Sequence, residues 1–173
     1  MTAMRYTLDQ LNAAPREAFV AALAGIYERS PWVAEEAAHA RPFASVSALV
    51  EAMAGIVARA GQARQLALIK AHPELAGKAA VRGELTAEST REQAGAGLTQ
   101  CTQEELDTLR HLNRAYRDKF GFPFILAVRG YERSAIIANF QARLGNGRDE
   151  ELRESLAQID RIARFRIAEL IEG

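Results

Sequence analysis

The sequence predicts an all-α protein, a single-domain multi-helix bundle with no sheet of note. Three observations support this. Ala, Leu, Glu, Arg and Gln, which favour helices, make up most of the chain. Apolar residues recur at intervals of three and four, and capping residues with Gly or Pro stops separate the periodic segments. A length of 173 residues suits one domain, which we expect to span residues 1–173.

The first 71 residues carry several helix signals in order. Residues suited to begin a helix are Thr7 with Gln10 in capping-box spacing, Pro15, Ser30-Pro31, and Ser45 or Ser47. The apolar stripes that accompany them are Phe19, Leu23 and Ile26, then Leu49, Met53 and Ile56, then Leu66 and Ile69. The last helix must end by Ala71, because Pro73 disfavours a helical conformation at His72.

The remaining residues predict four more helices. These are a short helix over Glu88 to Ala96, a long helix opened by Thr102 and Glu105 and ending at Phe120, a helix over Ser134 to Leu144, and a final one over Asp149 to Ile171. Between the second and third of these, Phe124 to Val128 is the only short apolar run that could be extended.

Composition narrows the class of function. The 22 basic and 22 acidic residues balance, so no basic excess favours nucleic acid or an anionic membrane. The single cysteine, Cys101, allows no intramolecular disulfide and is interpreted as a bystander thiol. No apolar stretch reaches the roughly 18 residues of a membrane span, and no signal peptide is evident. We therefore expect a soluble, cytoplasmic protein.

One of the three histidines lies at a position suited to chemistry. His39 and His111 lie beside charged residues in predicted helices and are interpreted as surface side chains. His72 lies in the segment Ile69 to Lys78, where a helix ends. The partial negative charge of a helix C-terminus favours the imidazolium and raises the pKa of the histidine, which suits a general acid. The alternative is that His72 only caps the helix.

Two further clusters could contribute to a site. Ser89, Glu92 and Gln93 share one face of a helix and could bind a small polar substrate, although Ser89 and Glu92 also have the spacing of a capping box. The apolar run after Phe120-Gly121-Phe122-Pro123 could present backbone N–H and C=O groups to a ligand, or could simply be a connector that crosses the core.

Taken together, three segments resemble one family, the 2-oxo-4-hydroxy-4-carboxy-5-ureidoimidazoline (OHCU) decarboxylases. These segments are His72-Pro73-Glu74-Leu75-Ala76-Gly77-Lys78, Ser89-Thr90-Arg91-Glu92-Gln93-Ala94-Gly95-Ala96-Gly97-Leu98 and Phe120-Gly121-Phe122-Pro123-Phe124. Below they are called the first, second and third motif. The resemblance covers nearly the whole chain; Glu74 stands where the family often has Asp.

The resemblance implies an all-α, cofactor-free enzyme, usually a homodimer, that forms (S)-allantoin in urate degradation. It implies that His72 is the proton donor and that Glu92 orients the substrate and destabilises its carboxylate. The positions it implies for substrate binding are Pro73, Ser89, Gln93, Phe124, Ile125, Leu126, Ala127 and Val128. The arginine that meets the substrate carboxylate is left open among Arg91, Arg129 and Arg161.

The absence of a cofactor is chemically reasonable for this substrate. Decarboxylases normally need an electron sink from a cofactor or metal. In OHCU the carboxylate is attached next to a ring C=N, whose nitrogen can accept the electrons. The sequence shows no metal-ligand or nucleotide-binding pattern. Two alternatives remain, a non-catalytic helical ligand-binding or interaction module and a metal hydrolase that uses His72 with Glu74 or Glu92.

Overall fold

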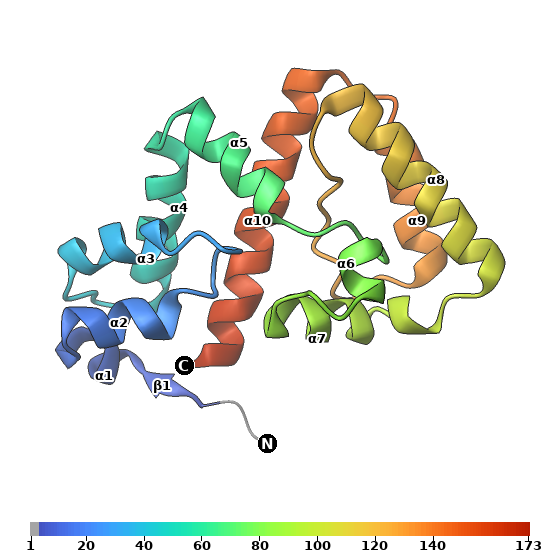
Figure 1. Cartoon of the computed structure of the whole chain (residues 1–173). Helices are drawn as coiled ribbons and strands as arrows, with labels where there is room; N and C mark the ends of the chain where they lie inside the picture. The colour runs from blue at the N-terminus through green and yellow to red at the C-terminus, as the bar shows by residue number, and fades with distance from the viewer. Residues whose placement is uncertain (1–3) are drawn as a thin grey trace. The chain divides into compact units, whose positions relative to one another are not determined.

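A computed structural model describes residues 4–173, and it confirms an all-α architecture (Figure 1). The elements in chain order are β1 (Tyr6–Thr7), α1 (Leu8–Ala13), α2 (Arg16–Leu23), α3 (Trp32–Ala37), η1 (Ala38–Ala40), α4 (Val46–Arg59), α5 (Gln62–Ala71), α6 (Lys78–Val81), α7 (Ala87–Gly95), η2 (Leu98–Gln100), α8 (Gln103–Phe120), α9 (Arg133–Arg143), α10 (Arg148–Leu170) and β2 (Ile171–Glu172). Within residues 4–173 the only sheet is the parallel pair β1–β2. No helix of this part of the chain has the length and apolar character that a membrane span needs.

The chain forms two compact units. The first contains residues up to 68 together with 160–173, and the second contains residues 69–159, so the boundary falls inside α5 and α10. The prediction of one domain over residues 1–173 stays a prediction. The three motifs all lie in the second unit, which therefore contains most of the predicted site.

The first unit is built around the predicted apolar stripes. Phe19 and Leu23 of α2 and Leu49 and Met53 of α4 are almost fully buried. The predicted capping box holds: the Thr7 side chain accepts from the Gln10 N–H, and the Gln10 side chain accepts from the Thr7 N–H. Pro15 precedes α2 as its N-cap rather than as its first residue, a difference of one position.

A buried ion pair ties the two ends of the first unit together. The Arg166 guanidinium donates to the Glu28 carboxylate over 2.8 Å, and both side chains are nearly inaccessible. Arg166 also donates to the Gly25 carbonyl, so its charge is surrounded by acceptors. The ion pair and the additional hydrogen bond offset the cost of removing the two charged side chains from water.

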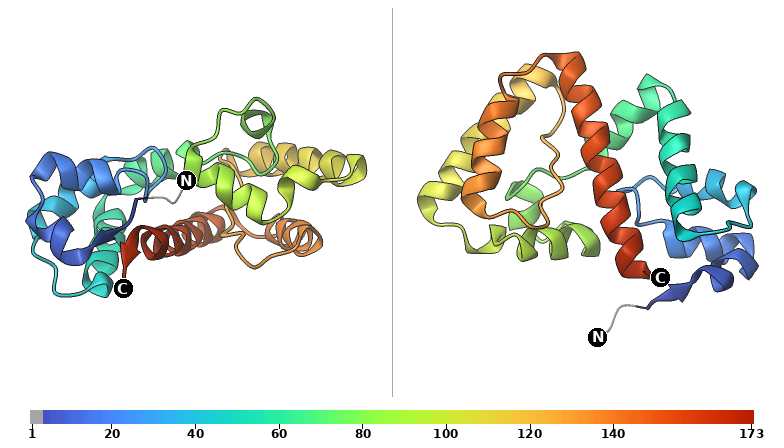
Figure 2. Two further views of the ribbon diagram at one scale, coloured as in Figure 1. Left: turned by 90° about the horizontal axis from the view of Figure 1, so that it is seen from below. Right: turned by 180° about the vertical axis from the view of Figure 1, so that it is seen from behind.

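In the second unit α8 and α9 pack side by side, and the segment between them runs alongside α9 and the first turns of α10 (Figure 2). The core is aromatic: Tyr116 of α8 contacts four phenylalanine rings, and Phe124 stacks on Phe140 with ring centroids 3.9 Å apart. Thr102 and Glu105 form the predicted capping box of α8, and Gly121 ends that helix in a left-handed conformation. The aromatic cluster fixes the start of the third motif.

Two sequence expectations differ from the structure in the second unit. The spacing of Ser89 and Glu92 suggested a capping box, but Thr86 is the N-cap of α7, and its hydroxyl accepts from the Ser89 N–H. Ser89 therefore lies inside the helix and not at its N-cap. The four-residue helix α6 was not predicted, because it is too short to show an apolar period.

Candidate active site

The predicted proton donor lies at the end of a helix and lines a pocket. α5 ends at Ala71, as Pro73 requires, and the His72 N–H closes the last turn on the Ile69 carbonyl over 3.2 Å. His72 is largely buried and lines a pocket of about 360 Å³. The first motif contributes His72, Pro73 and Glu74 to this pocket, and the third contributes Gly121, Phe122 and Pro123. The fold therefore brings the first and third motifs together.

The turn that follows His72 is strained and held from two helices. Ala76 has φ of 51°, a left-handed conformation that costs a non-glycine residue about 1–3 kcal/mol. Its N–H donates to the Gln93 side-chain oxygen of α7 over 2.9 Å. The preceding carbonyl, of Leu75, accepts from the Asn113 amide of α8 over 3.0 Å. These bonds fix the backbone of the first motif against the second motif and α8.

An ion pair adds a second contact between α8 and this turn. Arg117 lies four residues after Asn113, so both side chains project from the same face of α8. The Arg117 guanidinium pairs with the Glu74 carboxylate. The Glu74 carbonyl also accepts a long hydrogen bond from the Gln93 amide, 3.4 Å. The acidic residue of the first motif therefore has a positioning role in this chain.

The predicted substrate-facing residues of α7 share an inward face. Ser89 and Gln93 are each 4% exposed, and Glu92, on the same face, is half-buried. The structure gives Gln93 a role that was not predicted, because its amide oxygen holds the Ala76 N–H. Direct contact of Ser89, Glu92 and Gln93 with substrate, and a position of Glu92 across from His72, stay predictions.

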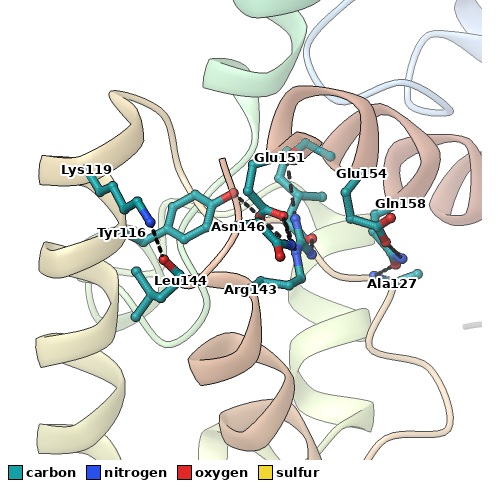
Figure 3. Close-up of polar contacts among 11 residues, drawn as sticks. Tyr116, Lys119, Ala127, Arg143, Leu144, Asn146, Glu151, Glu154 and Gln158 are labelled. Atoms are coloured by element: carbon teal, nitrogen blue, oxygen red, sulfur yellow. Dashed lines mark hydrogen bonds and ion pairs between the residues drawn. The ribbon is translucent and has the colours of Figure 1, made fainter. Parts of the chain in front are cut away.

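The third segment, Phe124 to Val128, is buried and lies outside any helix or strand. Two of its backbone groups are held by long-range side chains, Arg143 of α9 and Gln158 of α10, both of which are labelled in Figure 3. The Gln158 side-chain oxygen accepts from the Ala127 N–H over 3.0 Å, and Arg143 donates to the Ile125 carbonyl. The segment is therefore a fixed part of the unit.

A buried ionic network supports this attachment. Arg143 and Glu151 form an ion pair of 2.9 Å, with side chains that are 7% and 0% exposed. The Glu151 carboxylate also accepts from the Tyr116 hydroxyl over 2.6 Å and from the Asn146 amide over 2.9 Å (Figure 3). Burial and the hydrogen bond to Glu151 raise the pKa of Tyr116 well above its ordinary value, so the hydroxyl stays protonated and donates.

Two residues of the segment have backbone groups without a hydrogen-bond partner. Within residues 4–173, neither the N–H nor the C=O of Phe124 or of Leu126 is hydrogen-bonded, although these residues are only 1% and 4% exposed. Unpaired backbone groups in such surroundings are costly, and a bound ligand can satisfy them. The backbone of Leu126 is therefore suited to hold a small amide-rich molecule.

The structure does not choose among the three arginines that could meet the substrate carboxylate. Arg91 and Arg129 are exposed residues of the second unit, whereas Arg161 belongs to the first unit. In the part of the chain that the structure describes, no cluster of three His, Cys, Asp or Glu side chains could hold a metal ion. Sequence analysis missed Asn113, Arg143 and Gln158, and their only signal was a polar residue on the apolar side of a predicted helix.

The chain is similar to several known proteins over most of its length. The family model described as OHCU decarboxylase matches residues 12–168. The 2-oxo-4-hydroxy-4-carboxy-5-ureidoimidazoline decarboxylase of Halalkalicoccus jeotgali is 42% identical over 96% of this chain and 92% of that protein. The uric acid degradation bifunctional protein PucL of Bacillus subtilis is 43% identical over 96% of this chain and 33% of that longer protein. A crystal structure of (S)-allantoin synthase has a TM-score of 0.74 at 30% identity, covering 95% of this chain and 54% of that one.

Proposed function

The chain belongs to the OHCU decarboxylase family, and from this premise we propose that it converts OHCU to (S)-allantoin and CO₂ in urate degradation. The observation that carries the proposal is the pocket in which His72 of the first motif meets residues of the third. A buried imidazole beside a cavity is what a reaction that ends in proton delivery requires. The Gln93 side chain accepts from the Ala76 N–H and donates to the Glu74 carbonyl of the same turn, which brings the second motif to it as well.

The proposed reaction needs little from the protein beyond orientation and one proton. The bond between the ring carbon and the carboxylate breaks, and its electrons form a double bond to the neighbouring ring carbon while the C=N electrons move to nitrogen, so that CO₂ leaves and an enol remains. The enol hydroxyl passes its proton to that nitrogen as it becomes the ring carbonyl, and His72 donates a proton to the neighbouring carbon, which bears the ureido arm, on one face of the ring. Because the proton comes from one direction, the product has one handedness. A positioned general acid typically accelerates such a step by about 10²–10⁴.

Glu92 has the second catalytic role in the proposal. An ionised carboxylate near the substrate repels its carboxylate group and favours departure as neutral CO₂, while accepting a hydrogen bond from the substrate hydroxyl. Its half-buried position on the inward face of α7, between the buried Ser89 and Gln93, supports this role.

The ring and its ureido arm would be held by paired hydrogen bonds. The free N–H and C=O of Leu126 match an amide-like edge, and the fixed Phe124 to Val128 segment supplies the rest of the surface. Ser89, Gln93 and Pro73 complete the proposed binding residues. We further propose a homodimer, on the basis of the family resemblance alone, and a cytoplasmic location.

The test is to generate OHCU in situ from urate and to follow the chirality of allantoin by circular dichroism. We expect the protein to accelerate formation of the (S) enantiomer. His72→Ala should lower turnover by about 10²–10⁴ while leaving the far-UV spectrum unchanged. Glu92→Gln should lower turnover with little effect on ligand binding, because it removes charge but keeps shape.

Matched controls are available on α8. His111 and Glu104 are exposed there, so His111→Ala and Glu104→Gln should retain full activity. Normal turnover by His72→Ala would remove His72 from the mechanism, and normal turnover by Glu92→Gln would show that the negative charge is unnecessary. A protein that neither accelerates the reaction nor gains thermal stability from allantoin would instead be the non-catalytic binding module.

A further inference from the structure

A second pocket of the same unit is strongly basic. It has a volume of about 420 Å³ and lies between the turn of the first motif, α6 and α8. Five of its lining residues are cationic: Lys78, Arg82, Arg110, Arg114 and Arg117. Among the described residues that line it, Glu74 is the single acidic one. In a chain of zero formal charge, this is a marked local concentration of positive charge.

Most of these cations have no partner among residues 4–173. Arg117 pairs with Glu74. The side chains of the other four, Lys78, Arg82, Arg110 and Arg114, form no ion pair or hydrogen bond with any of residues 4–173. Arg110 and Arg114 are four residues apart on one helix face, where like charges repel. An anion bound among these side chains would remove the repulsion.

We propose that this pocket is a binding site for a small multivalent anion, a phosphate or polycarboxylate compound. Arginine side chains present paired N–H donors that match the oxygens of phosphate and carboxylate groups. A volume of this size suits a small molecule and excludes the length of a nucleic-acid strand. Several separated charges favour a multivalent ligand over a single chloride ion.

The basic pocket shares residues with the pocket that His72 lines. Glu74, Lys78 and Arg117 belong to both. An anion that binds Arg117 competes with Glu74, whose backbone is part of the turn that follows His72. Occupation of the basic pocket therefore changes the decarboxylation rate; this consequence rests on the proposed function, whereas binding itself does not.

The experiment measures binding without substrate. Pyrophosphate and citrate are titrated into the full-length protein by calorimetry, with sodium chloride at matched ionic strength as the reference. We expect saturable binding of at least one of the two, and the preferred one identifies the phosphate or the polycarboxylate class. The double variant Arg110→Ser/Arg114→Ser should lose about tenfold in affinity or more, because it removes two charged donors.

The matched control removes the same charge elsewhere. Arg16 and Arg153 are exposed and line neither pocket, so Arg16→Ser/Arg153→Ser should bind as the wild type does. Heats no larger than those of sodium chloride, or an equal loss of affinity in both double variants, would overturn the proposal. If the anion binds but the decarboxylation rate does not change, only the proposed effect of binding on catalysis is overturned. If the protein has no decarboxylase activity but still binds the anion, the proposed function fails while the anion site stands.

Discussion

Removal of the Glu151 carboxylate should destabilise the second unit strongly. In Glu151→Ala, the buried Arg143 loses its counter-charge, and the Tyr116 hydroxyl and the Asn146 amide lose their acceptor. Breaking a buried, hydrogen-bonded pair from one side typically costs about 3–5 kcal/mol. Because Glu151 is 0% exposed and has three donors, we expect the free energy of unfolding to fall by that amount.

The assay is thermal and urea unfolding followed by circular dichroism at 222 nm, which monitors helices of both units. A loss of 3–5 kcal/mol corresponds to a decrease in Tm of roughly 6–20 °C for a chain of this length. Fluorescence provides a second probe, because the single tryptophan, Trp32, belongs to the first unit. Transitions that coincide by both probes would show that the units unfold together.

Two variants make the reasoning refutable. Glu150→Ala removes an exposed carboxylate from the same helix turn and should cost less than about 1 kcal/mol. Arg143→Met/Glu151→Leu replaces both charges by apolar groups and should be more stable than Glu151→Ala, because no charge is left buried alone. A cost below 1 kcal/mol for Glu151→Ala would show that the network contributes little to stability.

Two pKa shifts give further predictions. Burial, with the nearby Glu105 carboxylate, raises the pKa of Cys101, so its reaction with a disulfide reagent at pH 8 should be slower in the folded than in the urea-unfolded protein. Hydrogen bonds from the Thr102 N–H and from Arg133 lower the pKa of Glu105 below its ordinary value. The ionised carboxylate therefore stabilises the folded protein fully above the pKa that Glu105 has in the unfolded chain, and this contribution is lost as the pH falls through the lower pKa of the folded state. A carboxyl titration by NMR measures the folded pKa, and Arg133→Gln should raise it.

The parts of the fold that could be predicted are those fixed by neighbours in sequence. Thr7 and Thr102 cap helices because the partner backbone N–H lies three residues ahead, and Pro73 limits α5 whatever surrounds it. At α7 the same local reasoning left the role of Ser89 open between a cap and a substrate-facing residue, and the structure shows that Thr86, three residues earlier, is the cap. The spacing of capping residues locates the start of a helix to within a turn, but it does not decide which of two capping residues one turn apart is the N-cap.

The parts that could not be predicted depend on residues far apart in sequence. Arg143 contacts Ile125 and Glu151, and Asn113 contacts Leu75, which is 38 residues away. Nothing in the sequence near either partner specifies the other. The three motifs could be recognised in the sequence. The contacts between them could not be predicted, because they depend on how α7, α8 and α10 pack.

The strained turn at Ala76 needs support from two helices that are distant in sequence, α7 and α8. A left-handed alanine is unfavourable by about 1–3 kcal/mol in isolation, so the conformation persists only where other contacts impose it. Gln93 supplies one such contact and Asn113 another, each from a different helix. The direction in which the chain leaves His72 thus depends on α7 and α8 rather than on the first motif alone. A loss of either contact is expected to move the turn even though neither side chain carries a proton in the proposed reaction.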